Sequence, residues 1–334
     1  MRTRSRRLLT ALIAVVVVVA VPLGWNQVSV QPGASIVRVL FEANAFPEPP
    51  NFAEIQSTVS VTSNISIPTP EAPNAALDIY VPKQASAKPR PIVMWVHGGG
   101  FISGSKEQVR DYVTVLAAKG FVVASLDYSL APGTQYPAPI RQGNAALKYL
   151  SDHATNFGGD KTAMFVGGDS AGSQIASQLA ALQTNPTLAR QMNLTPGIAS
   201  SALRGALLFC GLYNMETVGS TGFPALRSFL WSYTGYRDWL SYPDISQLST
   251  TGNVTSAYPA TLLTVGDADP FESQGKELVA ALNAKKVPVT SQFYTGSGAK
   301  LGHEYQFDFS HPESQKMFDL TVSFLTTHSS KGNS

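Results

Sequence analysis

The chain has 334 residues, of which 44% are hydrophobic and 14% are charged, and its formal net charge is +2. This length and hydrophobic content allow one large α/β domain, or two ordinary domains, with a substantial buried core. The small net charge and scattered basic residues exclude a nucleic-acid-binding surface. Cys210 is the only cysteine, which excludes an intramolecular disulfide and a cysteine-based zinc site, and its apolar surroundings predict a buried thiol.

Residues 1–24 combine four arginines with an uncharged, apolar stretch over residues 8–23. Sixteen helical residues span about 24 Å, shorter than the roughly 30 Å hydrocarbon core but longer than many signal-peptide apolar regions. We therefore predict a membrane anchor or a cleaved signal segment, and the poor cleavage sites favour the anchor. Arginines before the span place the rest of the chain outside the cytoplasm, either anchored to the membrane or, after cleavage, secreted or periplasmic.

Residues 25–54 are predicted to form a linker and part of a cap, with a short amphipathic helix near residues 36–43. Residues 55–327 are predicted to form one domain, and residues 328–334 a tail. Apolar, β-branched runs between turn residues predict eight strands, over residues 58–61, 76–81, 92–96, 121–126, 163–166, 206–210, 261–265 and 289–294. Helical periodicity covers residues 109–118, 140–150, 171–182, 272–282 and 313–325.

Strand and helix alternate from residue 92 onward, after two strands without a helix between them. This order predicts an α/β fold with an eight-stranded, mostly parallel sheet, helices on both faces, and an antiparallel pair at the N-terminal edge. Ligands bind at the carboxyl ends of the strands in such sheets. The aromatic-rich insertion over residues 213–245 leaves the sheet near that edge, so we predict a cap that shapes a pocket, with ordinary packing as the alternative.

Ser170 lies in Gly168-Asp169-Ser170-Ala171-Gly172, between a predicted strand and a helix of small residues. A G-x-S-x-G sequence in this context is typical of a nucleophile elbow, and the helix N-terminus makes the Ala171 N–H a predicted oxyanion donor. A serine hydroxyl needs a base to remove its proton. Among the five histidines, His303 is the predicted base because it lies in the loop before the last helix, and His311 is its rival.

Two carboxylates, Asp267 and Asp269, follow the strand predicted at residues 261–265. Asp269 is preferred as the acid that orients His303, because Pro270 restricts it to an extended conformation. In the alternative, Asp269 caps the following helix and Asp267 serves the histidine. The order Ser170, Asp269, His303 is the order of α/β-hydrolases.

Three glycines follow the strand at residues 92–96 in the sequence His97-Gly98-Gly99-Gly100. Glycine N–H groups can turn toward a carbonyl oxygen without side-chain obstruction. Gly99 and Gly100 are therefore predicted to complete an oxyanion hole with Ala171.

With its HGGG and GDSAG motifs the chain resembles the hormone-sensitive-lipase-like carboxylesterases of the α/β-hydrolase superfamily, over residues 55–327. The resemblance implies a serine carboxylesterase that acts on small to medium acyl esters through an acyl-enzyme, without a metal or an organic cofactor. A peptidase or amidase, a polysaccharide deacetylase, and a non-catalytic adhesion or scaffold protein are the alternatives. The predicted partners are a small-molecule ester and, through residues 1–24, a membrane.

Overall fold

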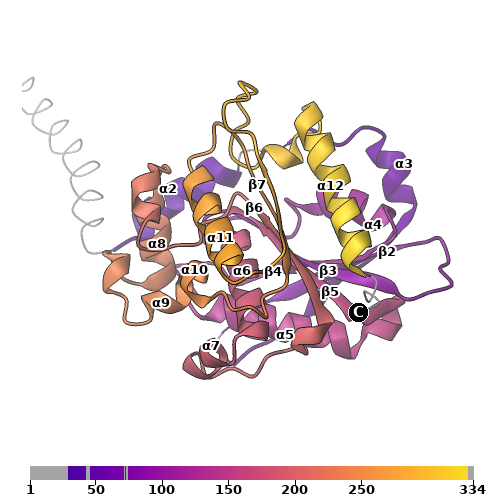
Figure 1. Cartoon of the computed structure of the whole chain (residues 1–334), viewed down its shortest axis with the longest axis horizontal. Coiled ribbons are helices and arrows are strands. Elements are labelled where there is room, and N and C mark those ends of the chain that lie inside the picture. The colour runs from indigo at the N-terminus through magenta and orange to yellow at the C-terminus, as the bar shows by residue number, and fades with distance from the viewer. Residues whose placement is uncertain (1–28, 43–45, 71, 73, 330–334) are drawn as a thin grey trace, which may run out of the picture.

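The eight predicted strands form a single sheet. The structure is a computed structural model that describes residues 29–42, 46–70, 72 and 74–329 (Figure 1). Its strands lie in the order β1-β2-β4-β3-β5-β6-β7-β8. They are β1 (Val59–Ser66), β2 (Ala76–Pro82), β3 (Arg90–Val96), β4 (Val122–Asp127), β5 (Gly159–Asp169), β6 (Leu203–Phe209), β7 (Ala260–Val265) and β8 (Val289–Phe293).

Strand direction follows the predicted pattern. β2 pairs antiparallel with β1 and β4, and the other neighbouring strands pair in parallel. The last five residues of β3 are buried, as a parallel strand covered on both faces requires. The edge strand β1 is mostly exposed. The predicted α/β fold class is confirmed.

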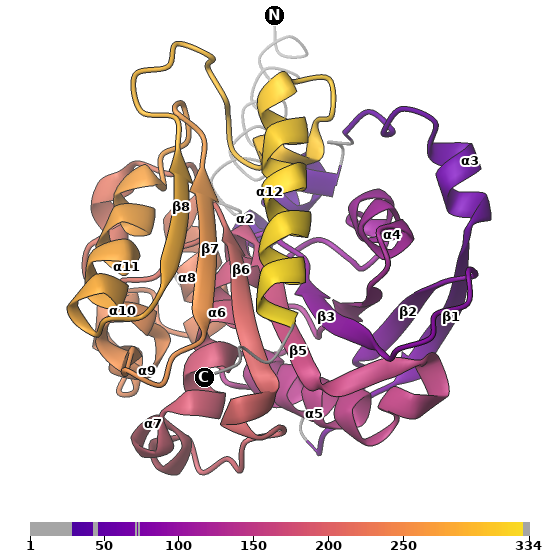
Figure 2. The ribbon, with the colours of Figure 1, turned by 45° about the vertical axis from the view of Figure 1, so that its right-hand side comes forward.

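Helices cover both faces of the sheet (Figure 2). Side chains of α5, α6 and α11 pack against one face with Met94, and those of α4 and α12 pack against the other face with Trp95. The α-helices are α2 (Gln31–Glu42), α3 (Phe52–Ser57), α4 (Arg110–Ala118), α5 (Ala138–Asp152), α6 (Ser170–Thr184), α7 (Pro186–Gln191), α8 (Leu226–Thr234), α9 (Ile245–Leu248), α10 (Thr250–Asn253), α11 (Glu272–Ala284) and α12 (Pro312–Ser329). Every residue of α6 is buried, so the helix that begins at Ser170 is held rigidly inside the molecule.

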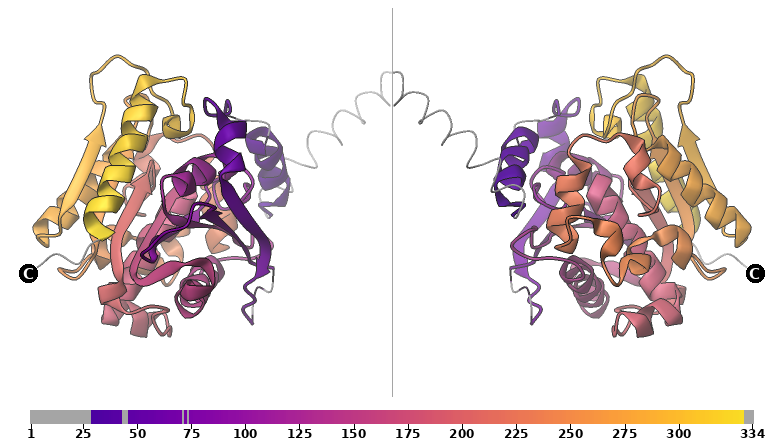
Figure 3. Two further views of the ribbon diagram at one scale, coloured as in Figure 1. Left: turned by 90° about the vertical axis from the view of Figure 1, so that its right-hand side faces the viewer. Right: turned by 90° about the vertical axis from the view of Figure 1, so that its left-hand side faces the viewer.

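The aromatic-rich insertion contains α8, which lies beside α2 although the two helices are far apart in the chain (Figure 3). α2 begins at Gln31, five residues before the helix that the sequence predicted. The division into linker, cap and tail stays a prediction. Residues 1–24, the predicted anchor or signal segment, lie outside the described residues. Among the helices of the described ranges, none has the length and apolar character needed to cross a membrane.

Candidate active site

Ser170 occupies the sharp turn between β5 and α6. Its φ of 50° lies in the left-handed region, which side-chain-bearing residues rarely adopt. A Cβ atom at Gly172 would lie 2.1 Å from the carbonyl oxygen of Val96, and one at Gly168 would lie 2.5 Å from the carbonyl oxygen of Gly172. Only glycine fits at these two positions, so the G-x-S-x-G pattern is a packing requirement of the turn.

The structure brings together the three side chains that the sequence predicted to act as a unit. His303 Nε2 lies 2.8 Å from Ser170 Oγ, and His303 Nδ1 lies 2.8 Å from Asp269 Oδ2. The second Asp269 oxygen, Oδ1, accepts a hydrogen bond from the backbone N–H of Phe271 at 2.8 Å. The aromatic rings of Phe223 and Phe271 lie against the imidazole, with ring centroids 4.9 and 5.5 Å away. Both imidazole nitrogens are therefore hydrogen-bonded, and two aromatic rings pack against the imidazole ring.

The surroundings of His303 alter its proton affinity. Burial disfavours the charged imidazolium, but the hydrogen bond to Asp269 and the negative charges of Asp269 and Glu304 outweigh burial and raise the pKa of His303 above 6.5. Such an imidazole is a stronger base than histidine in water. This electrostatic setting suits a group that must take a proton from a hydroxyl.

Asp267, the alternative acid, lies elsewhere in the loop. Its carboxylate accepts hydrogen bonds from the backbone N–H groups of Leu301 and Lys300, at 2.6 and 3.2 Å, and from the Ser297 hydroxyl at 3.0 Å. Although desolvation acts in the opposite direction, these hydrogen bonds lower the pKa of Asp267. Asp267 thus holds the segment that leads to His303. The rival base, His311, lies 3.5 Å from Asp308 and is not brought to Ser170.

The glycines after β3 form a loop next to Ser170. Gly99 and Gly100 have φ values of 98° and 61°, which a residue with a side chain would adopt only with strain. A Cβ atom at Gly100 would lie 2.4 Å from the ring of Phe229 in α8, so the aromatic-rich insertion packs directly on this loop. None of the hydrogen bonds found among the described residues uses the N–H groups of Gly99, Gly100 or Ala171. These three predicted donors remain available to an oxygen atom of a substrate.

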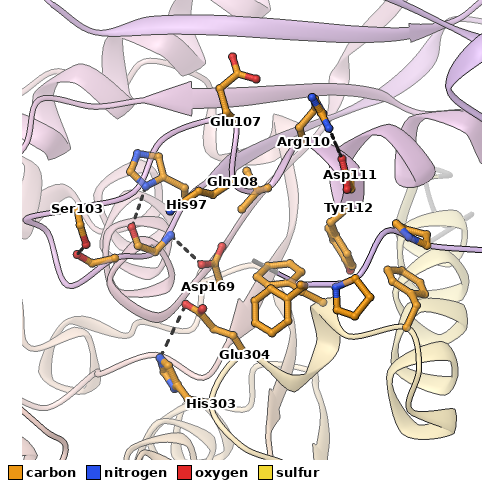
Figure 4. Close-up of a pocket in the computed structure, with 18 of the residues that line it drawn as sticks. His97, Ser103, Glu107, Gln108, Arg110, Asp111, Tyr112, Asp169, His303 and Glu304 are labelled. Carbon is orange, nitrogen blue, oxygen red and sulfur yellow. Dashed lines mark hydrogen bonds and ion pairs between the residues drawn. The ribbon is translucent and has the colours of Figure 1, made fainter. Parts of the chain in front are cut away.

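A cavity of about 820 Å³ opens beside His303 (Figure 4). Its wall has an apolar part and a charged part, and the carboxyl groups of Asp169 and Glu304 also line it near the histidine. The apolar part comprises Phe46, Pro47, Pro49, Phe223, Pro224, Pro270, Phe307 and Phe309, and the charged part comprises Glu107, Arg110 and Asp111. The sequence reasoning missed Phe46, Phe307 and Phe309, because no local pattern shows that such distant segments share a wall.

Two further acidic side chains, Asp169 and Glu304, lie between the glycine loop and His303. They were not predicted from the sequence. The Asp169 carboxylate accepts hydrogen bonds from Trp95 Nε1 at 2.8 Å and from the backbone N–H of Gly98 at 2.7 Å. Glu304 Oε1 lies 3.8 Å from His303 Nε2. Burial, followed by the adjacent Glu304 carboxylate, raises the pKa of Asp169 well above its ordinary value. The only sequence signal was position, since each residue directly adjoins a predicted catalytic side chain.

Cys210, Asp269 and His303 offer three possible metal ligands within 4.8 Å of one another. Asp269 and His303 are already hydrogen-bonded to each other, and His303 is also bonded to Ser170. Burial raises the pKa of the Cys210 thiol well above its ordinary value, so the sulfur is not the thiolate that a metal requires. The donor set fits a hydrogen-bonded catalytic group and does not fit a metal site. As predicted, Cys210 is buried.

Comparisons with known proteins agree with the fold. A family model described as alpha/beta hydrolase fold matches residues 93–302, a range that includes Ser170 and Asp269 and ends one residue before His303. The match confirms the predicted resemblance to α/β-hydrolases.

Among curated relatives, arylacetamide deacetylase-like 2 of Homo sapiens is 35% identical over 125 residues, 36% of this chain and 29% of that protein. Esterase LipC of Mycobacterium tuberculosis is 35% identical over 115 residues, 34% of this chain and 28% of that protein. The chain spans between 28% and 58% of the length of eight curated relatives that it matches. Among solved structures, esterase B of Lactobacillus rhamnosis has a TM-score of 0.75 at 21% identity, covering 93% of this chain and 96% of its own.

Proposed function

The chain belongs to the alpha/beta hydrolase fold family, and from that membership we propose that it is a serine carboxylesterase that hydrolyses small to medium acyl esters. The observation that carries the proposal is the continuous hydrogen-bonded chain from Ser170 through His303 to Asp269, with both contacts at 2.8 Å, beside a cavity of about 820 Å³. The relatives named as esterases add support from sequence.

In the proposed acylation step, Ser170 Oγ attacks the ester carbonyl carbon while His303 Nε2 takes the hydroxyl proton. Asp269 keeps the imidazole in the required tautomer and stabilises the imidazolium without taking its proton. The N–H groups of Gly99, Gly100 and Ala171 donate hydrogen bonds to the carbonyl oxygen as its negative charge develops. The carbon–oxygen bond to the alcohol then breaks, and His303 donates its proton to the departing alcohol oxygen.

The second half of the cycle uses the same groups. A water molecule loses a proton to His303 and attacks the acyl-Ser170 carbonyl carbon, and the oxyanion again lies against the three N–H groups. The bond to Ser170 Oγ then breaks, His303 returns the proton to the serine, and the carboxylic acid leaves. The left-handed backbone of Ser170 keeps its hydroxyl exposed to both reactions.

The substrate range is proposed from the cavity. The apolar side chains that line the cavity favour an ester whose groups next to the carbonyl are hydrophobic, and a volume of about 820 Å³ limits their length. A peptidase, an amidase or a polysaccharide deacetylase would use the same triad, and the assay below separates these activities.

The proposed location follows from residues 1–24, which lie outside the described residues. We propose that this segment exports the enzyme and retains it at the membrane. Alkaline phosphatase fused after residue 28 should be active outside the cytoplasm and sediment with membranes. An inactive fusion would rule out export, whereas an active fusion found in the soluble fraction would show cleavage in place of anchoring.

The function is tested with p-nitrophenyl esters from acetate to palmitate, using the full chain beside Ser170→Ala, His303→Ala and His311→Ala variants. We expect activity that peaks on short or medium chains, is lost in the first two variants, and is retained in His311→Ala. Covalent labelling by a fluorophosphonate should require Ser170. A folded wild-type chain that labels but hydrolyses only amides or acetylated polysaccharides would replace the esterase proposal, and one that does not label would favour a non-catalytic role.

A further inference from the structure

Two carboxyl groups meet beside the proposed catalytic residues without a basic partner between them. Asp169, which is only 2% exposed, immediately precedes Ser170, and Glu304 immediately follows His303. Figure 4 shows the two carboxyl groups facing one another between the glycine loop and the histidine. After burial, the adjacent Glu304 carboxyl group is the main cause that raises the pKa of Asp169.

Gly98 provides a geometric measure of how closely the two groups approach. A Cβ atom at Gly98 would lie 2.4 Å from Asp169 Oδ2 and 2.7 Å from Glu304 Oε1. Both oxygens therefore lie close to the same side of the Gly98 Cα atom. Ionised carboxylates are acceptors only, so a hydrogen bond between two carboxyl groups requires a proton on one of them. Asp169 is buried and Glu304 is partly buried, so ionising both adjacent carboxyl groups together is unfavourable.

We propose that Asp169 and Glu304 hold one proton between them at neutral pH, and that the resulting O–H···O bond is a positioning device that joins the His303 loop to the oxyanion loop. The inference rests on the proposed esterase function for its effect on catalysis, but the shared proton itself does not depend on that function.

Three separate segments are joined in this way. Asp169 ends β5 and accepts the Gly98 N–H, which fixes the start of the glycine loop. Glu304 belongs to the loop of His303, where its own backbone is left-handed, with a φ of 60°. When the shared proton is lost at alkaline pH, two adjacent carboxylates repel one another. We expect this repulsion to displace His303 relative to the N–H groups of Gly99, Gly100 and Ala171.

His303 is the basic group that contacts the pair, since its Nε2 lies 3.8 Å from Glu304 Oε1. The titratable side chains that face the pair are His303 from the same loop, His97 after β3, Tyr112 from α4, Tyr128 after β4 and Cys210 after β6. Burial raises the pKa values of Tyr112, Tyr128 and Cys210, so these three groups are neutral near pH 7. The ring of His97 lies 3.6 Å from Asp127, on the far side of the glycine loop.

The proton shared by Asp169 and Glu304 is tested by the pH profile of kcat/KM in Glu304→Gln and Glu304→Leu. A glutamine amide can donate a hydrogen bond to Asp169 in place of the shared O–H. The net charge of the pair is then the same as in the wild type. In Glu304→Gln we therefore expect the alkaline limb to move to higher pH, whereas the acid limb moves to lower pH because Glu304 helps to raise the pKa of His303. Glu304→Leu loses the link, so its kcat should fall by about 10- to 100-fold with little change in KM, and glutamine should rescue part of that loss.

A pair in which both carboxyl groups are ionised should give a different pH profile of kcat/KM. If both carboxylates are ionised in the wild type, Glu304→Gln removes a negative charge near His303. The acid limb would move to lower pH in either case, so an alkaline limb that stays in place would overturn the proposal. An exposed residue of α3 provides the control, because Glu54→Gln should leave both limbs unchanged.

Infrared spectroscopy detects the shared proton without any substrate. The difference spectrum between wild type and Glu304→Gln should contain a carboxylic-acid C=O band at neutral pH, which Glu54→Gln lacks. That band should disappear as pH rises through the alkaline limb. An inactive wild type that shows the band would refute the esterase function alone, whereas an active enzyme without the band would refute the proton-sharing pair alone.

Discussion

Asp267 and Leu301 are joined by a 2.6 Å hydrogen bond from the Leu301 backbone N–H to the Asp267 carboxylate, two residues before His303. Asp269, two residues further along its own loop, contacts the histidine directly. Two neighbouring carboxylates after β7 thus have different tasks. One holds the loop that carries His303, and the other forms a hydrogen bond with the His303 imidazole.

Replacing Asp269 by asparagine should lower kcat by about 10⁴-fold, the effect of the corresponding change in another Ser-His-Asp triad, because the amide favours the wrong imidazole tautomer. The matched variant Asp267→Asn loses acceptor capacity for the loop but leaves the His303 contact in place. Its kcat should fall far less. Steady-state kinetics on one p-nitrophenyl ester compares the two variants, and the reverse order of effects would identify Asp267 as the orienting acid.

The pH dependence of kcat/KM should show an acid limb set by His303. Only the neutral imidazole accepts the Ser170 proton, so activity is lost as pH falls through the pKa of His303, which lies above 6.5. Because Asp269 raises this pKa, the residual activity of Asp269→Asn should have its acid limb at lower pH. A limb that stays in place in this variant would show that another group titrates.

The nucleophile turn should tolerate no side chain at Gly172. Its Cβ atom would lie 2.1 Å from the Val96 carbonyl oxygen, a backbone atom that cannot move alone. Gly172→Ala should therefore lower the free energy of unfolding by at least about 1–3 kcal/mol, as overpacking does in other cores. Gly252→Ala is the control, since its Cβ atom meets nothing within 4 Å. Equal denaturant midpoints for both variants would contradict the packing argument.

Helix α2 is attached to the domain by Arg38. Its guanidinium donates to the carbonyl oxygens of Ile102, at 2.6 Å, and Ala131, at 3.2 Å. Hydrogen bonds of charged groups contribute about 1.5–3 kcal/mol each, so Arg38→Met should loosen α2 while the triad stays intact. We expect faster amide hydrogen exchange in α2 and a higher KM with a smaller change in kcat. Unchanged exchange would show that packing alone holds the helix.

Structural elements with local signals were predictable from the amino-acid sequence. Apolar runs bounded by turn residues predicted all eight strands, and the small residues around Ser170 predicted the turn before α6. β5 extends from Gly159 to Asp169, well beyond the predicted residues 163–166, because its first residues are polar and carry no hydrophobic pattern. The G-x-S-x-G context selected Ser170, the loop before the last helix selected His303, and Pro270 favoured Asp269. The structure brings these side chains within hydrogen-bonding distance.

Features that arise from contacts between distant segments became visible only in the folded structure. Asp267 and Asp269 have the same chemistry and nearly the same position after β7, so only loop geometry assigns the histidine contact to Asp269. The meeting of Asp169 and Glu304 likewise has no pattern in either segment, because it arises where the ends of β3 and β5 approach the His303 loop. Local periodicity reports which face of an element is buried, but it carries no information about which polar groups meet at the ends of the strands.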